Sequence, residues 1–131
     1  MSDADALLDA ARAVRRNAYA PYSNFAVGAA VRAEDGTIVP GCNVENASYG
    51  LGICAERNAL TTAVAMGLRR FTAIAIAGPD GIATAPCGAC RQFIAEFDPA
   101  MPVTYTGPGG PVQTTLAHLL PESFGPHALG K

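Results

Sequence analysis

Apolar residues recur with a helical period at the start of the chain. Between residues 3 and 16 they fall three or four positions apart, and Ser2 precedes them as a candidate N-cap. Their positions are Ala6, Leu7, Ala10, Ala11 and Val14. This pattern predicts an amphipathic helix. Arg12, Arg15 and Arg16 near its end complement the helix dipole, which favours a solvated face over a binding patch.

The next two elements form a predicted hairpin. Residues 27–33 are small and apolar, as is typical of a buried strand. Asp35-Gly36 is a tight-turn sequence, so residues 37–44 should return as an antiparallel partner. Asn43 and Glu45 are therefore expected at the end of the second strand.

Two helices are predicted farther along the chain, and each begins at a cysteine. The first covers about residues 54–66 and stops at Gly67; its interior has no charged face, which predicts burial on more than one side. The second covers about residues 87–97, because Pro99 disfavours helical geometry in the residue before it. Between them, residues 71–77 are rich in β-formers and predict a central strand.

The last part of the chain predicts a strand pair and a short helix. Residues 107–110 are too few for a helical crossover, so strands near 103–106 and 112–114 should pair antiparallel. A short helix over 115–120 and a polar tail follow. The element order predicts one α/β domain over residues 1–131, a layered fold with a mixed sheet of about five strands and helices on both faces.

Composition narrows the function classes. Hydrophobic residues make up 50% of the chain and the formal net charge is −2, so there is no basic footprint for nucleic acid. No stretch approaches a membrane-spanning length, and the N-terminus lacks the apolar core of a signal peptide. We expect a soluble, cytoplasmic protein with neither nucleic acid nor a membrane as partner.

Three of the four cysteines form the candidate chemical site. Cys54 is isolated, and Cys87 and Cys90 form a C-x-x-C pair whose sulfurs can reach one ion. Catalytic zinc takes three protein ligands and a water, and Glu56 has the position of the acid/base carboxylate in zinc deaminases. A structural zinc site, which needs four protein ligands, and a thioredoxin-like redox pair are the alternatives. Cys42 lies outside the pattern and is interpreted as a small buried hydrophobe.

Three segments of the chain resemble the small homotetrameric cytidine deaminases. They are Cys54-Ala55-Glu56-Arg57, Pro86-Cys87-Gly88-Ala89-Cys90-Arg91-Gln92 and Gly41-Cys42-Asn43-Val44-Glu45-Asn46-Ala47-Ser48-Tyr49. The likeness runs from about residue 22 to residue 97 and more weakly to residue 124. It implies the deaminase fold and one Zn²⁺ per chain on Cys54, Cys87 and Cys90. It also implies hydrolysis of cytidine and 2′-deoxycytidine to uridine and 2′-deoxyuridine, with release of ammonia, in pyrimidine salvage.

The resemblance also implies roles for the residues beside the ligands. Glu56 would shuttle a proton from the attacking water to N3 of the pyrimidine ring. Zinc with three thiolates carries a net charge of −1, and Arg57 can offset it by donating hydrogen bonds to the ligand sulfurs. The plain alternative for Arg57 is a surface or interface salt bridge.

Substrate binding is expected from residues outside the zinc motifs. The resemblance implies that Phe25 lies against the base, that Asn43 and Glu45 bind the ribose hydroxyls, and that Ala55 contacts the substrate. Without the resemblance, core packing for Phe25, a loop cap for Asn43 and a surface charge for Glu45 would be favoured. Deamination of another aminopyrimidine, such as blasticidin S, and a zinc-stabilised binding module are the alternative functions.

Assembly is the last expectation. The uncharged helix after residue 54 and the apolar Leu119, Leu120 and Phe124 exceed what one small domain would bury, which predicts contact between chains. The resemblance implies a homotetramer with shared active sites, in which Phe124 stacks on the base in a neighbour's site and Tyr49 lies near that junction. The alternative is that Phe124 folds back on its own core.

Overall fold

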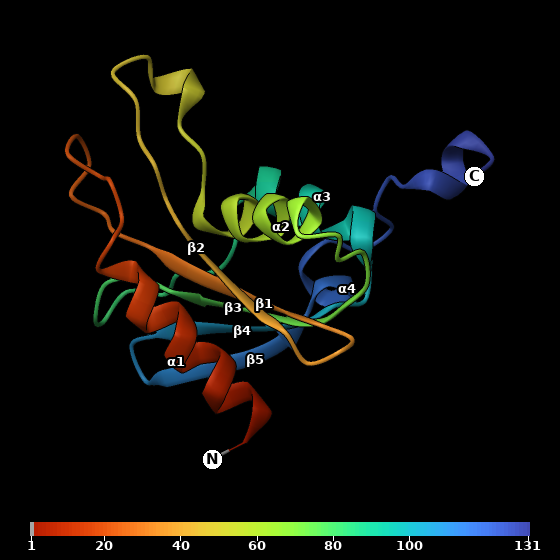
Figure 1. Ribbon diagram of the computed structural model, residues 1–131, viewed down its shortest axis with the longest axis horizontal. Coiled ribbons are helices and arrows are strands. Elements are labelled where there is room, and N and C mark those ends of the chain that lie inside the picture. The colour runs from red at the N-terminus through yellow and green to blue at the C-terminus, as the bar shows by residue number, and fades with distance from the viewer. Residues whose placement is uncertain (1) are drawn as a thin grey trace.

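The computed structural model describes residues 2–131, and its elements follow the predicted order (Figure 1). They are α1 (Asp3–Arg15), β1 (Gly28–Ala33), β2 (Ile38–Cys42), η1 (Tyr49–Leu51), α2 (Ala55–Ala65), β3 (Phe71–Ala77), α3 (Gly88–Phe97), β4 (Pro102–Gly107), β5 (Gly110–Thr115), α4 (Leu116–Leu119) and η2 (Pro126–Leu129). Over residues 2–131, no helix has both the length and the apolar character needed to cross a membrane.

The five strands form one sheet in the order β2-β1-β3-β4-β5. β3 and β4 are parallel and the other neighbouring pairs are antiparallel, so the sheet is mixed as predicted. α1 covers one face, while α2 and α3 cover the other (Figure 1). β3 lies in the middle of the sheet, where its apolar sequence suits burial on both faces.

α1 begins at the predicted cap and lies directly on β1. The Asp5 N–H donates to the Ser2 hydroxyl at 3.1 Å and the Ser2 N–H donates to the Asp5 carboxylate at 3.2 Å, which satisfies two N-terminal donors. Gly28 permits the close approach, because a Cβ there would lie 2.7 Å from the Arg15 backbone nitrogen. Arg15, one of the arginines predicted to be solvated, is partly buried and donates to the Ala26 carbonyl at 2.7 Å.

α2 packs one face on the sheet and leaves the other exposed. A Cβ at Gly41 of β2 would lie 2.8 Å from the Ala59 Cα, so the helix rests on the strand backbone. The exposed face comprises Thr61, Thr62, Ala65 and Met66. Burial of α2 on more than one side is therefore a wrong prediction for the single chain. The two threonine hydroxyls donate to carbonyls one turn earlier in the helix, which satisfies them without a packing partner.

Two further expectations change in the structure. Cys42 is partly exposed, because it ends the edge strand β2. Leu119 and Leu120, which we expected to lie against another chain, are partly buried against the core of their own chain. Phe124 lies beyond them on a tail that extends away from the body, with 61% of its surface exposed (Figure 1). The alternative that Phe124 folds back on its own core is therefore excluded for this chain.

Candidate active site

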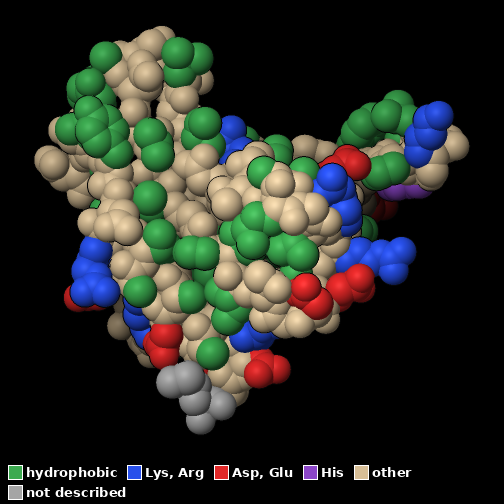
Figure 2. All heavy atoms as spheres, in the orientation of Figure 1, with side chains coloured by type: hydrophobic (Ala, Val, Ile, Leu, Met, Phe, Trp, Pro, Cys, Tyr) green, Lys and Arg blue, Asp and Glu red, His purple; other side chains and the backbone are tan. Residues whose placement is uncertain are grey.

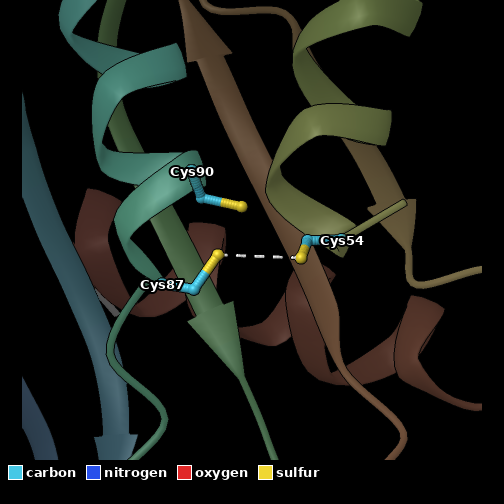
Figure 3. A group of neighbouring side chains, drawn as sticks. All are labelled: Cys54, Cys87 and Cys90. Carbon is cyan, nitrogen blue, oxygen red and sulfur yellow. Dashed lines mark hydrogen bonds between the residues drawn. The ribbon is translucent and has the colours of Figure 1, made fainter. Parts of the chain in front are cut away.

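The three candidate ligands come from the beginnings of two helices. Cys54 is the N-cap of α2, Cys87 is the N-cap of α3, and Cys90 lies in the first turn of α3. Neither N-cap side chain caps its own helix, so both thiols are free to turn toward an ion. Figure 3 shows all three side chains pointing toward one another across the gap between the helices. The helix N-termini favour thiolates at these positions, because unpaired N–H groups and the dipole are positive there.

The spacing of the sulfurs fits zinc. All three Sγ atoms lie within 4.8 Å of one another, and the Sγ atoms of Cys54 and Cys87 are 3.8 Å apart. Two sulfurs on one tetrahedral zinc, each with a bond of about 2.3 Å, lie about 3.8 Å apart. A disulfide would need a separation of about 2.05 Å. The geometry therefore favours a metal site over a redox pair.

The thiols are also coupled electrostatically. A hydrogen bond from Cys90 lowers the pKa of Cys54 to about 5, and Arg57 adds to the lowering. The same hydrogen bond, followed by burial, raises the pKa of Cys90. Crowded thiolates resist carrying several negative charges, whereas a divalent cation among them makes full ionisation favourable. The donor set is thus suited to a bound cation.

Arg57 points its guanidinium at the sulfur cluster. Its Nη2 donates to the Cys54 Sγ at 3.5 Å. Its Nε is buried and has no hydrogen-bond partner within residues 2–131. A positive charge held this close to the thiolates opposes their excess negative charge. This geometry suits charge compensation. Among residues 2–131, Arg57 forms no salt bridge.

Glu56 lies beside the cluster and is shielded from solvent. Only 4% of its surface is exposed. Burial raises the pKa of the Glu56 carboxyl, and the negative charge of Cys54 adds to the rise. A raised pKa makes the protonated form of a carboxyl more accessible, which suits a group that must both accept and release a proton.

A pocket of about 340 Å³ opens beside the cluster and brings most of the predicted site together. Its walls are Ser23, Phe25, Val27, Asn43, Glu45, Cys54, Ala55, Glu56, Thr84, Ala85 and Cys87. Four of these residues were not predicted from the sequence: Ser23, Val27, Thr84 and Ala85. The last two directly precede Pro86-Cys87, which was the one available signal for them.

Asn43 fixes the loop that carries Phe25. Its Oδ1 accepts a hydrogen bond from the Val27 N–H at 2.9 Å, and its Nδ2 donates to the Phe25 carbonyl at 2.8 Å. Asn43 thus bridges the two residues on either side of position 26. The loop-fixing alternative for Asn43 is therefore realised, and its side chain also faces the pocket.

Glu45 ties the neighbouring loop to the same pocket. Its carboxylate accepts hydrogen bonds from the Tyr22 N–H at 3.0 Å, from the Ser23 N–H at 3.1 Å and from the Ser23 hydroxyl. These bonds, that of the Ser23 side chain foremost, lower the pKa of Glu45. The pocket therefore carries an ionised carboxylate on the wall formed by Asn43 and Phe25.

Comparison with known proteins identifies the family. The model of the cytidine and deoxycytidylate deaminase zinc-binding region matches residues 1–106. This chain belongs to that deaminase family. The cytidine deaminase of Sporosarcina psychrophila is 48% identical over 124 residues, covering 93% of this chain and 91% of the relative.

Solved structures agree with the family assignment. The crystal structure of cytidine deaminase from Burkholderia pseudomallei matches with a TM-score of 0.87 and 52% identity, covering 92% of this chain and 98% of that one. The crystal structure of cytidine deaminase from Mycobacterium tuberculosis matches with a TM-score of 0.82 and 40% identity, covering 95% and 99%. The expected family, deaminase fold, hydrolase class and zinc cofactor are confirmed, and the cysteine cluster suits one Zn²⁺ per chain.

Two residues expected at a deaminase site lie outside the pocket of this chain. Tyr49 is 79% exposed and borders an adjoining hollow that shares Ser23 and Glu45 with the pocket; its ring lies 5.9 Å from that of Tyr22. Phe124 is on the tail, and its carbonyl accepts a hydrogen bond from Gln92 Nε2 at 2.9 Å. Neither side chain lines the pocket beside the cysteines.

Proposed function

We propose that the chain catalyses the hydrolytic deamination of cytidine and 2′-deoxycytidine, giving uridine and 2′-deoxyuridine and releasing ammonia for pyrimidine salvage. One observation carries this proposal: two of the three thiols at zinc spacing, those of Cys54 and Cys87, line the same pocket as a buried carboxyl and the three residues Phe25, Asn43 and Glu45. A binding module stabilised by zinc would have no use for a buried Glu56 beside the ligands.

Cys54, Cys87 and Cys90 hold the zinc, and Arg57 offsets the charge of their thiolates. When bound, zinc supplies Lewis-acid activation of the water that attacks the ring. Three protein ligands would leave one position on the ion for that water, as catalysis requires and a structural site does not. The need for three reduced thiols also supports a reducing compartment, and we place the protein in the cytoplasm.

Glu56 moves the protons. Its carboxylate accepts a proton from the attacking water and delivers it to N3 of the pyrimidine ring. The water oxygen first adds to C4, which becomes tetrahedral. Glu56 then carries the remaining hydroxyl proton to the amino nitrogen, the bond from C4 to that nitrogen breaks, ammonia leaves, and a carbonyl remains at C4. Burial of Glu56 supports this role, because a carboxyl shielded from water exchanges protons with the substrate rather than with bulk solvent.

The remaining pocket residues select a nucleoside. Phe25 packs against the base, the Ala55 backbone contacts it, and Asn43 and Glu45 bind the ribose hydroxyls. The ionised state of Glu45 supports this role, because a carboxylate accepts strong hydrogen bonds from hydroxyl groups. An aminopyrimidine without ordinary ribose hydroxyls, such as blasticidin S, would leave these acceptors unpaired and is the less favoured substrate.

The active enzyme is proposed to be a homotetramer whose sites are shared between chains. Two observations support assembly: the outer face of α2 is exposed and uncharged, and exposed hydrophobic side chains gather on the projecting loops and on the C-terminal tail (Figure 2). Those with at least half of their surface exposed are Tyr19, Tyr49, Leu51, Met66, Phe124 and Leu129. A neighbour's Phe124 then stacks on the base, and Tyr49 lies near that junction.

A substrate panel tests the function. Purified enzyme with zinc should release ammonia from cytidine and 2′-deoxycytidine, more slowly from free cytosine, and negligibly from single-stranded DNA, whose 3′ oxygen is esterified. Ammonia release measured by a coupled assay gives the rates. Zinc-loaded protein that releases no ammonia from either nucleoside would contradict the proposal.

A further inference from the structure

One residue of β4 holds both ends of the loop that joins β3 to α3. The Gly78 N–H donates to the Thr106 hydroxyl oxygen at 2.9 Å. The Thr84 N–H donates to the Thr106 carbonyl, also at 2.9 Å. Gly78 is the first residue after β3, and Thr84 lies three residues before Cys87. Thr106 therefore binds the loop where it leaves the sheet and where it approaches the cysteine cluster.

The two loop ends are in direct contact. A Cβ at Gly78 would lie 2.6 Å from the Cβ of Thr84, so only glycine allows this approach. Thr84 is 8% exposed, and its hydroxyl donates to the Ile82 carbonyl at 3.1 Å. We refer to Gly78, Thr84 and Thr106 together as the loop clamp. None of the three belongs to the zinc motifs.

The chain between the loop clamp and the cysteine is short and stiff. Only Ala85 and Pro86 separate Thr84 from Cys87. Pro86 is fully buried, its ring fixes φ, and its carbonyl accepts a hydrogen bond from Arg91 Nε at 2.7 Å. A displacement of Thr84 therefore has only Ala85 and Pro86 through which to reach the Cys87 backbone. Thr84 also lines the pocket beside Cys87, so the same displacement would alter the pocket wall.

We propose that the Thr106 hydroxyl is a positioning residue for the metal centre: by holding Gly78 against Thr84, it fixes the place of the Cys87 thiol. This inference rests on the proposed role of Cys87 as a zinc ligand. Groups that orient a ligand without touching the metal commonly change metal affinity by 10- to 100-fold when they are removed. Loss of the hydroxyl should therefore loosen the hold of the chain on zinc.

Zinc release tests the loop clamp without relying on turnover. Holoenzyme is mixed with excess chelator below the unfolding temperature of each variant, and the rate of zinc transfer is followed by absorbance. Thr106→Val, which keeps the shape but loses the acceptor, should release zinc about tenfold faster than the parent. Thr106→Ser restores the hydroxyl and should return the rate to that of the parent.

Thr104→Val is the matched control. Thr104 lies two residues earlier on the same face of β4, is buried to a similar degree and pairs with Ala75 and Gln113 in the sheet. Its variant should release zinc at the parent rate. A purely structural role for Thr106 would lower the thermal midpoint and leave zinc release from the folded protein unchanged.

Three results would overturn the inference. Thr106→Val could release zinc at the parent rate, or Thr106→Ser could release it as fast as Thr106→Val. Thr104→Val could also release zinc as fast as Thr106→Val. If Thr106→Val does not fold, Gly78→Ala separates the loop ends directly and should also speed zinc release; an unchanged rate there would overturn the inference. Full zinc content in Cys87→Ala would refute both the proposed metal site and the proposed role of the loop clamp. If Cys87→Ala loses zinc but Thr106→Val releases zinc at the parent rate, the proposed role of the loop clamp alone is refuted.

Discussion

The cysteine cluster and the outer loops of this chain differ in how far their side chains are held in place by contacts within the chain. At the cluster, the thiols, Glu56 and Arg57 are already oriented by the chain's own helices. On the outer loops and tail, Tyr49 and Phe124 expose 79% and 61% of their surface and do not line the pocket. Buried charged and metal-binding groups must be paired within the folded chain, whereas an exposed aromatic ring can stay unpaired until another chain binds. The difference supports our proposal that the reacting groups come from one chain and that a second chain completes the binding of the base.

The largest effect is expected from a ligand. Cys87→Ala should lose zinc and all measurable turnover, because three thiolates are needed to hold the ion between two helices. Metal analysis of the purified variant gives the zinc content per chain. Cys42→Ala is the control, since Cys42 lies outside the cluster, and it should keep its zinc. Full zinc occupancy in Cys87→Ala would remove this residue from the ligand set.

Glu56→Gln should separate metal binding from proton transfer. The amide keeps the shape of the side chain but cannot accept a proton, so kcat should fall by at least about 10³-fold while the fold and zinc content are retained. Steady-state kinetics and metal analysis on the same preparation measure both. Turnover near that of the parent would assign the proton transfer to another group.

Glu45 tests the part of substrate binding that lies within one chain. Glu45→Ala should lower kcat/KM for cytidine by about 10- to 100-fold, because a charged hydrogen-bond acceptor for the ribose is lost. Free cytosine is the internal control, since it carries no sugar and also reports any damage to the loop that Glu45 holds through Ser23. An equal loss of kcat/KM on the two substrates would show that Glu45 does not bind the sugar.

Phe124 tests the part of substrate binding that we propose a neighbouring chain supplies. Light scattering should show a tetramer, and Phe124→Ala should raise KM for cytidine about tenfold, because a stacking partner is lost. Its zinc content should be unchanged. Leu129→Ala, on the same tail and 66% exposed, is the matched control and should keep the parent KM. A fully active monomer would refute the shared site.

The smallest effect concerns the ionisation of Glu45. Its folded-state pKa lies below the ordinary value of 4.5, because Ser23 and the Tyr22 backbone donate hydrogen bonds to the ionised form. The contact is therefore present above pH 4.5 and is lost as pH falls through the lower folded value. The Ser23 amide resonance should titrate with a midpoint below 4.5, and Ser23→Ala should move the Glu45 midpoint upward. A midpoint at or above 4.5 in the parent would contradict the observed hydrogen bonds.

The elements of the fold were predictable because local physics sets them. Gly67 ends α2 with a positive φ of 91°, and Pro99 lies just beyond the end of α3. The strand order was not predictable, because the position of β1 between β2 and β3 depends on packing between segments far apart in the sequence. Burial of α2 within its own chain was misjudged for the same reason: among residues 2–131, nothing covers its uncharged outer face.

The candidate site divides in the same way. The ligands and Glu56 were found because their chemistry fixes both residue type and spacing. Thr84 and Ser23 were missed because each occupies the pocket wall through a contact made elsewhere, Thr84 with β4 and Ser23 with Glu45. Small hydroxyl residues carry no spacing rule that a single sequence could reveal.

Subunit complementation tests most directly whether the chemistry and the stacking ring come from different chains. Glu56→Gln and Phe124→Ala chains are co-expressed with different tags, and oligomers that carry both tags are purified. In a shared site, an intact Glu56 from one chain meets an intact Phe124 from the other, so a fraction of sites should show the parent KM for cytidine. If the mixed oligomers show only the raised KM of the Phe124→Ala variant, each site draws both residues from one chain and the account is contradicted.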